Sequence, residues 1–241
     1  NDFKVVGQMV NASNSTLVIE SNDQRYIYKP RSGERPLWDF PDHTLYLRER
    51  AAYVTSELLG WNVVPETTIQ EGPYGIGSLQ KWIDAEPATV DIFPPTEVPQ
   101  GWLTIMSGID EEGDQVTLAH EDSARLQQIA VFDTLINNAD RKAGHLLTDE
   151  SGKTFGIDHG VTFSADNKLR TVLWGWIGQG FPEQYLTDLA SLKSKVPGSE
   201  LEELLDQSEV AALIDRLESL LVQKIMPSPS PHWPAVPWPV F

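Results

Sequence analysis

The chain has 241 residues, and its 18 Lys and Arg against 35 Asp and Glu give a net charge of −17 at pH 7. This balance argues against nucleic acid or an anionic membrane as the main partner, because both are bound by clusters of basic side chains. Its 40% hydrophobic and 9% aromatic residues are enough to form a core, which excludes a disordered chain.

The first part of the chain, residues 1–83, predicts a strand-rich lobe. Strand-like runs at 3–6, 16–19 and 25–28 are separated by turn-forming residues, and long polar and apolar side chains alternate in the third run. A helical pattern at 45–59 ends at Gly60, a residue typical of helix C-termini. Strand-like segments follow at 63–64, 67–69 and 76–83.

The composition then changes twice. Residues 84–101 are rich in proline and acid and predict a connector between lobes. Residues 102–226 predict a helical C-terminal lobe, with apolar helical patterns at 123–135 and 199–225. We therefore expect an α+β fold of two lobes.

The proline-rich tail, residues 227–241, is incompatible with a helix. Two interpretations stay open for it, docking onto the body in extended form and a linker.

Location is predicted from absences in the sequence. The chain has no cysteine, no apolar run of roughly 18 residues and no signal-peptide core. We expect a soluble, cytoplasmic protein without stable membrane association and without a nucleic-acid partner.

The polar residues that follow the helix at 123–135 form the most informative segment. Asp140 lies in a loop, and 145–148 and 154–157 predict a hairpin across a turn at 149–153. His145 opens the first strand and Asp158 closes the second, so both side chains are expected at the open end of the hairpin, beside Asp140. Carboxylates of this kind can hold Mg²⁺ and accept a proton during phosphoryl transfer.

A cation for phosphate groups is also available. Lys29 ends the strand at 25–28, and Glu49 on the following helix is a candidate to hold its ammonium group in place. Lys81 is a rival at the expected junction between the lobes.

The residues taken together resemble a known family. Lysine after a strand, a helix glutamate, Asp140-Arg141 in a loop and Asp158 before His-Gly resemble the protein-kinase-like superfamily. Six segments are similar, in order, to the phosphatidylinositol 3- and 4-kinase-related proteins of actinobacteria and to type II phosphatidylinositol 4-kinases, and more loosely to HipA-type kinases. They are 28–36, 47–53, 64–67, 77–80, 138–141 and 157–160.

The resemblance implies a protein-kinase-like fold that binds ATP with Mg²⁺ or Mn²⁺. Lys29 would contact the α and β phosphates, and Glu49 would brace it. Asp140 would be the catalytic base or the substrate-positioning residue, and Asp158 would hold the metal. The backbone at Gln80, Lys81, Trp82 and Ile83 would hold adenine.

Two positions depart from the family pattern. His145 stands where the second metal ligand is usually Asn. It would be a metal ligand or a phosphate contact, and a structural histidine is its alternative role. The phosphate loop has no glycine, and hydroxyls and amides at Ser13, Asn14 and Ser15 would replace the usual contacts.

The sequence therefore predicts an ATP-dependent phosphotransferase. Because of the acidic charge, we expect a protein Ser/Thr or a soluble small molecule as acceptor rather than a membrane lipid. A nucleotide-binding pseudokinase without turnover is the alternative, and transfer of AMP is a third.

Smaller features carry expectations of their own. Residues 31–40 predict either a lid over the cleft or a strut between lobes. Trp174 and Trp176 are expected in the core or in a groove wall. The remaining histidines lack ligand spacing and are expected at the surface, namely His43, His120 and His232.

Overall fold

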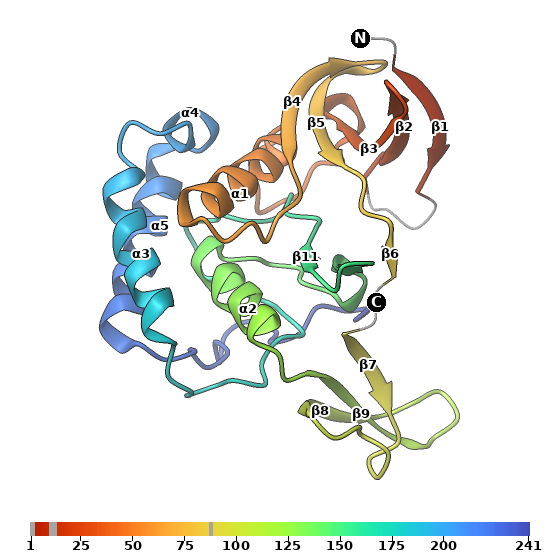
Figure 1. Cartoon of the computed structure of the whole chain (residues 1–241), viewed down its shortest axis with the longest axis vertical. Helices are drawn as coiled ribbons and strands as arrows, with labels where there is room; N and C mark the ends of the chain where they lie inside the picture. The colour runs from red at the N-terminus through yellow and green to blue at the C-terminus, as the bar shows by residue number, and fades with distance from the viewer. Residues whose placement is uncertain (1–2, 10–13, 87–88) are drawn as a thin grey trace.

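The computed structural model of the chain describes residues 3–9, 14–86 and 89–241. The N-terminal part is an antiparallel sheet in the order β1-β2-β3-β5-β4 (Figure 1). Its strands are β1 (Lys4–Gln8), β2 (Leu17–Ser21), β3 (Gln24–Pro30), β4 (Thr67–Gly72) and β5 (Gly75–Lys81). The three predicted strands are present, and Leu17, Ile19 and Tyr28 are buried with Leu79 of β5 in a small core.

Two local features concern strands β3, β4 and β5 of this sheet. A Cβ at Gly77 would overlap the carbonyl oxygen of Lys29, so only glycine lets β5 approach β3 closely at that lysine. The segment at 63–64 is buried, but it is not a strand. It is part of the irregular connection between the helix at 45–59 and β4.

Helix α1 (Leu45–Leu59) has the predicted bounds and ends at Gly60, whose φ of +71° suits a residue without a Cβ. The Glu34 carboxylate accepts hydrogen bonds from the Leu45 and Tyr46 backbone N–H groups. These amides have no partner inside the helix, so Glu34 stabilises its first turn. A turn of 3₁₀ helix, η1 (Arg31–Gly33), precedes this glutamate.

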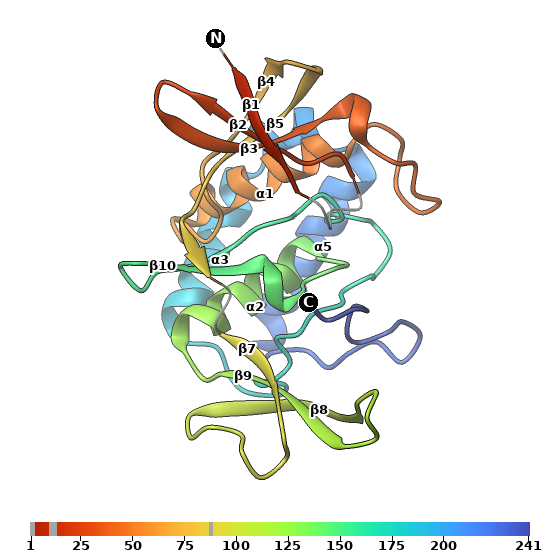
Figure 2. The same cartoon turned by 90° about the vertical axis from the view of Figure 1, so that its right-hand side faces the viewer.

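Strands continue further along the chain than the sequence predicted. Strand β6 (Ala85–Glu86) pairs with β10 (Leu146–Asp149), which forms a hairpin with β11 (Thr154–Gly156), close to its predicted bounds. Strands β7 (Val90–Phe93), β8 (Trp102–Ile109) and β9 (Gln115–Glu121) form a third sheet, seen at the bottom of Figure 2.

The expectation of a helical lobe from residue 102 is therefore wrong for its first twenty residues. Strand β8 is mostly exposed, so the alternation of polar and apolar side chains that marks a half-buried strand is weak there. The turn between them contains Gly113, whose φ is +91°.

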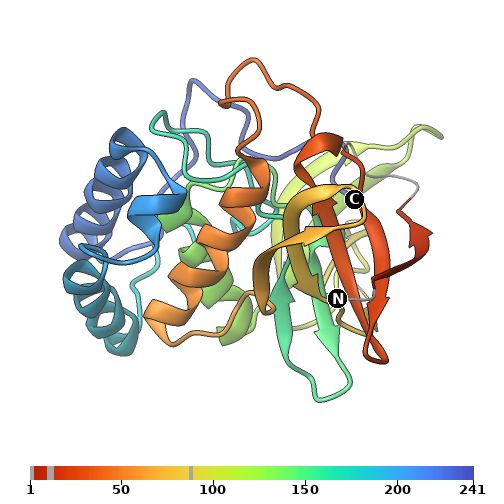
Figure 3. The ribbon, with the colours of Figure 1, turned by 90° about the horizontal axis from the view of Figure 1, so that it is seen from above.

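The helical part begins at α2 (Ala124–Ile136), which Ser123 caps by accepting a hydrogen bond from the Leu126 N–H. Helices α3 (Glu183–Lys195), α4 (Leu201–Leu204) and α5 (Gln207–Gln223) follow. In Figure 3, α3 and α5 lie on one side of the molecule and the strands on the other, with α1 between them. The α+β class and the order of a strand-rich part before a helical part are confirmed. None of the helices formed by the described residues is long and apolar enough to cross a bilayer.

Several single-residue expectations can be checked in this fold. Trp174 and Trp176 are buried in the main core, as predicted. His43 and His232 are exposed, but His120 is fully buried, so that prediction is wrong. The reason is its place on β9, where the ring stacks on Trp176 and Nε2 accepts from the Gly175 N–H.

The tail lies against the body. The Val240 carbonyl accepts from the Ala143 N–H, and the Ala235 carbonyl accepts from both the Thr171 N–H and the Trp174 indole. Ala143 begins η2 (Ala143–His145), the turn of 3₁₀ helix between Asp140 and β10. The tail therefore supports the loop that carries Asp140.

The ion pair between Arg48 on α1 and Glu209 on α5 gives a stability prediction. Both side chains are buried, at 1% and 8% exposure. Removing one partner leaves the other as a buried charge without a counter-charge. We expect Glu209→Gln to lower the free energy of unfolding by about 3 kcal/mol, measured by urea denaturation.

The matched control is Glu218→Gln, which breaks the Lys193–Glu218 pair, where both side chains are about half exposed. It should change the free energy of unfolding by less than about 1 kcal/mol. Equal effects of the two substitutions would contradict this account of the buried pair.

Candidate active site

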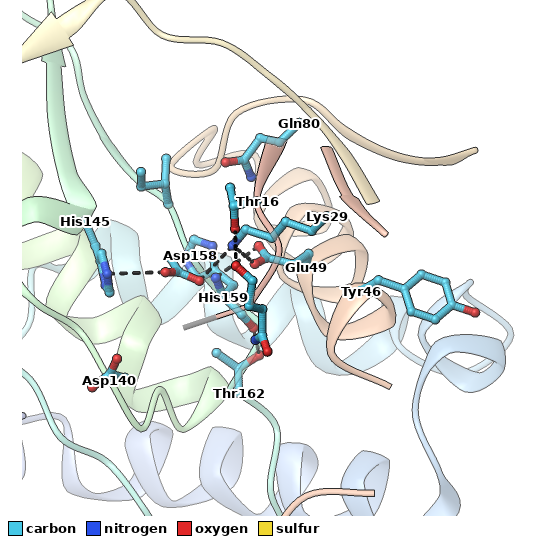
Figure 4. Close-up of polar contacts among 12 residues, drawn as sticks. Thr16, Lys29, Tyr46, Glu49, Gln80, Asp140, His145, Asp158, His159 and Thr162 are labelled. Atoms are coloured by element: carbon cyan, nitrogen blue, oxygen red, sulfur yellow. Dashed lines mark hydrogen bonds and ion pairs between the residues drawn. The ribbon is translucent and has the colours of Figure 1, made fainter. Parts of the chain in front are cut away.

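Lys29 lies at the centre of the polar cluster in Figure 4. Its Nζ is 2.5 Å from Glu49 Oε1 and 2.7 Å from Asp158 Oδ1. Burial opposes the charge of Lys29, but the carboxylates of Asp158 and Glu49 outweigh that effect and raise its pKa above the ordinary lysine value. The ammonium group is thus fixed between α1 and the segment that follows β11.

Glu49 joins three parts of the chain. One carboxylate oxygen binds Lys29, and the other accepts the backbone N–H of His159 at 3.0 Å. Its side chain is only 2% exposed, so it has little water to bind in place of these partners. Glu49 therefore sets the position of Lys29 relative to Asp158.

Asp158 is half exposed and has a φ of +58°, a conformation that non-glycine residues adopt rarely and that is concentrated at functional sites. Loss of solvation favours its protonated form, but Lys29 and then His145 outweigh this and lower its pKa. The side chain is therefore an anion at neutral pH.

His145 lies beside Asp158, with Nε2 3.3 Å from Asp158 Oδ2. Burial lowers the pKa of His145 to about 4, and the nearby Asp158 only partly offsets this. The neutral ring accepts at Nδ1 from the Lys142 N–H, at 3.4 Å, so its proton is on Nε2, the nitrogen that lies beside Asp158. The choice between a metal ligand and a structural histidine stays a prediction.

Asp140 faces the same cleft from the loop after α2, residues 137–141. Burial raises its pKa, Lys142 lowers it, and Asp158 raises it further. The backbone N–H of Asp140 donates to Asn138 Oδ1, and Lys142 Nζ lies 3.9 Å from its carboxylate. A carboxylate with a raised pKa is a better proton acceptor than an ordinary aspartate.

Arg141 holds this loop against the Asp158 segment. It is fully buried, pairs with Asp133 at 2.7 and 2.9 Å, and donates to the carbonyl of Ile157 and to His159 Nε2. Asp133 was not predicted from the sequence. It is the single acidic residue in the mostly apolar second half of α2, a pattern that could have indicated a buried ion pair.

These groups line a cleft of about 530 Å³. Lys29, Glu49, Asp140 and Asp158 all contribute to it, and so do Asn14 and Ser15 of the predicted phosphate loop. Ser13 lies outside the described residues.

The segment 31–40 contacts both the cleft and a distant part of the chain. Residues 34–40 line the cleft, which is where a lid would lie. Asp39 pairs with Lys168 at 2.9 Å, and the Lys168 Nζ lies 5.0 Å from the Trp38 ring centroid, contacts that a strut would make. The lid and the strut both stay predictions.

The adenine-contacting residues implied by the family resemblance lie elsewhere. Gln80, Lys81, Trp82 and Ile83 are not among the described residues that line the cleft. The Lys81 and Trp82 amides already donate to the carbonyls of Glu66 and Arg25, which leaves Ile83 as the amide without a described acceptor. The Lys81 side chain is exposed at the end of β5, so Lys29 alone of the two rivals joins the cluster.

The donor set fits a magnesium ion that also binds phosphates. Within the three described ranges, no three His, Cys, Asp or Glu side chains gather as an all-protein metal site. Mg²⁺ usually needs only one or two carboxylates when substrate phosphates and water complete its shell. Asp158 is the best placed of these carboxylates, because it is anionic and half exposed at the cleft.

Comparison with known proteins identifies a family. No family model matches the chain. It is 45% identical over 258 residues to Protein Rv2133c of Mycobacterium tuberculosis (strain ATCC 25618 / H37Rv), an alignment that covers 100% of this chain and 92% of that protein. The chain therefore belongs to the family of Rv2133c.

Two solved structures are similar at low identity. The Helicobacter pylori proinflammatory kinase CtkA has 13% identity, a TM-score of 0.48 and 93% coverage of both chains. The Rio2 kinase from Chaetomium thermophilum, in complex with ADP/Mg²⁺ and phosphoaspartate, has 12% identity, a TM-score of 0.38, and coverage of 91% of this chain and 72% of that one. At these TM-scores the likeness carries no argument about function.

The lowered pKa of His145 predicts a pH dependence of stability. In the unfolded chain histidine titrates near 6.5 and in the folded protein His145 titrates near 4, so the unfolded state binds more protons between these values. His145 therefore contributes stability above pH 6.5 that is lost as the pH falls toward 4. The loss is on the order of 3 kcal/mol.

His145→Asn, which does not titrate, isolates this effect. Urea denaturation of both proteins from pH 7 to pH 4.5 should show the wild type losing stability relative to the variant. A difference that stays constant with pH would show that His145 is not buried as a neutral ring.

Proposed function

We propose that the chain is an ATP-dependent phosphotransferase that acts on a protein Ser/Thr or a soluble small molecule. The observation that carries the proposal is the ammonium group of Lys29, held between Glu49 and Asp158 in a cleft that Asp140 also lines. Phosphoryl transfer needs little covalent chemistry from the protein and depends on this kind of charge placement.

Each residue has a distinct role in the proposed reaction. Lys29 neutralises phosphate oxygens of ATP, and Glu49 keeps the ammonium group in position. Asp140 accepts the hydrogen bond of the acceptor hydroxyl and takes its proton. The acceptor oxygen forms a bond to the γ phosphorus, the bond to the β-phosphate oxygen breaks, and ADP leaves with the electron pair.

Asp158 is the residue that would hold Mg²⁺ or Mn²⁺, and His145 would orient it. When bound, such a metal neutralises the negative charge of the phosphates. The low pKa of Asp158 supports this role, because a metal ligand must be deprotonated.

The acceptor follows from the charge. At −17 the chain lacks the excess of basic residues that holds an enzyme on an anionic bilayer, so a soluble acceptor is favoured over a lipid. The relation to phosphatidylinositol 3- and 4-kinases stays a prediction. Adenine binding by the backbone of Gln80 to Ile83 also stays a prediction, and Ile83 is the best candidate among them because its amide has no described acceptor.

A pseudokinase is the second candidate. Two observations favour it: His145 Nε2 lies 3.3 Å from Asp158 where a metal ligand is expected, and the Lys81 and Trp82 amides are already used. Such a protein would bind nucleotide without turnover.

The proposal predicts separate effects of three substitutions. Lys29→Met should lower ATP affinity at least about tenfold, and Asp158→Asn should lower the affinity for ATP with Mg²⁺ or Mn²⁺. Asp140→Asn should retain ATP binding but lower turnover by about 100-fold or more. Titration calorimetry measures binding, and ADP release together with autophosphorylation measures turnover.

The matched control is Lys153→Met, a lysine in the turn between β10 and β11 whose side chain is exposed. It should bind ATP as the wild type does. ATP binding without turnover, unchanged by Asp140→Asn, would replace the enzyme with the pseudokinase, and no binding at all would reject both. Mass spectrometry of the products would show adenylyl instead of phosphoryl groups if AMP is transferred.

A further inference from the structure

A second basic group lies in the cleft, on the Asp140 side. The Arg170 backbone N–H donates to the Asn138 carbonyl at 2.9 Å, and its own carbonyl accepts from the Arg141 N–H at 3.0 Å. Its side-chain Nε donates to the Ala139 carbonyl at 2.6 Å. Two backbone hydrogen bonds and one from Nε therefore hold Arg170 against the loop that carries Asp140, close enough for its charge to lower the pKa of that carboxyl group.

The tail covers one face of this guanidinium group. Arg170 Cζ lies 5.3 Å from the ring centroid of Trp233, and both residues line the cleft. Trp233 is held near the body by Ala235, whose carbonyl binds Thr171 and Trp174. Arg170 is thus packed on an aromatic ring and has little freedom left to lose when a ligand binds.

Arg170 is not neutralised by an ion pair, although its charge lowers the pKa of the nearby Asp140. In the described ranges no carboxylate oxygen lies within ion-pair distance of Arg170, and its two terminal nitrogens make no hydrogen bond. The neighbouring Lys168 differs, because Asp39 neutralises it. An unpaired, preorganised guanidinium group is suited to bidentate binding of a phosphate or carboxylate.

Position separates Arg170 from the groups that would serve ATP. Lys29 lies on β3, and Arg35, the other cleft arginine without a carboxylate partner in the described chain, has its N–H bonded to Asn14 of the predicted phosphate loop. Arg170 lies instead next to the proposed base, where the acceptor hydroxyl would be.

We propose that Arg170 and Trp233 form an acceptor subsite for a small anionic molecule that carries a hydroxyl group. The phosphate ester or carboxylate of the acceptor binds Arg170, its carbon skeleton lies against Trp233, and its hydroxyl reaches Asp140. This inference rests on the proposed function, since it names the acceptor class of the same site. It narrows the choice of acceptor to a small molecule, because Arg170 and Trp233 lie inside the cleft.

The test observes Trp233 directly. The full chain is labelled with 5-fluorotryptophan, and the ¹⁹F resonance of Trp233 is assigned with Trp233→Phe. The probes are glycerol 3-phosphate, glycerate and, as the neutral control, glycerol, each without nucleotide and again with ATP and Mg²⁺. Glycerol 3-phosphate and glycerate distinguish a phosphate from a carboxylate as the preferred anion.

We expect at least one anionic probe to shift the Trp233 resonance and glycerol not to. Arg170→Gln should raise the dissociation constant at least tenfold. Arg25→Gln, the matched control, also removes an arginine that lies over a tryptophan, Trp82, but outside the cleft, and should have no effect. The other seven of the eight tryptophans report whether a variant is folded. If Arg170→Gln is not folded, Arg170→Lys replaces it and should weaken binding severalfold, because lysine lacks the planar fork.

Other outcomes overturn the subsite. They are no shift with any anion, an equal shift with glycerol, a shift that Arg170→Gln retains, or a shift that ATP or Lys29→Met abolishes, which would place the anion in the triphosphate site. Because the nucleotide-free titration does not require ATP binding, a failed ATP titration with an intact Arg170-dependent shift would reject the proposed kinase function alone.

Discussion

The buried ion pair between Arg141 and Asp133 is the interaction on which the site depends. Arginine has five N–H donors, and here each has an acceptor: the two oxygens of Asp133, the carbonyls of His145 and Ile157, and His159 Nε2. A buried charge pair is tolerated only when its hydrogen bonds are complete in this way. The Arg141 side chain therefore fixes α2, the Asp140 loop and the Asp158 segment relative to one another. The distance between Asp140 and Asp158 depends on these contacts.

The same network continues into the N-terminal part of the chain. His159 accepts from Arg141 through its ring and donates through its backbone to Glu49, which in turn binds Lys29. Burial and the Arg141 charge lower the pKa of His159 well below the usual value, so the ring stays neutral and can accept from a guanidinium group. Because Lys29 also binds Asp158, an incoming phosphate must compete with that carboxylate for the ammonium group. A divalent cation bound at Asp158 would relieve this competition.

The parts of this network that are close in sequence were predictable, and the parts that are distant were not. Lys29 and Glu49 lie at the end of one strand and on the next helix, and the 145–158 hairpin brings its own ends together, so local patterns sufficed. Arg170 and Trp233 reach Asp140 only through chain segments that carry no periodic signal. The amides of Lys81 and Trp82 were assigned by resemblance, and their use by Glu66 and Arg25 depends on sheet contacts that the resemblance does not specify. Strand β8 was missed because it is exposed and therefore lacks alternation.

The net charge of −17 does not describe the charges that a ligand meets inside this cleft. At physiological salt the Debye length is about 8 Å, so most of the acidic surface neither repels nor attracts a ligand that is already bound. The cleft holds basic as well as acidic groups: Lys29, Arg35 and Arg170 line it together with Asp140 and Asp158, while Glu49 and Asp39 are each paired with a lysine. The overall charge therefore disfavours polyanionic surfaces such as membranes, which approach over a large area. A small anion that enters the cleft experiences the local basic groups instead, and its affinity depends on short contacts rather than on long-range steering.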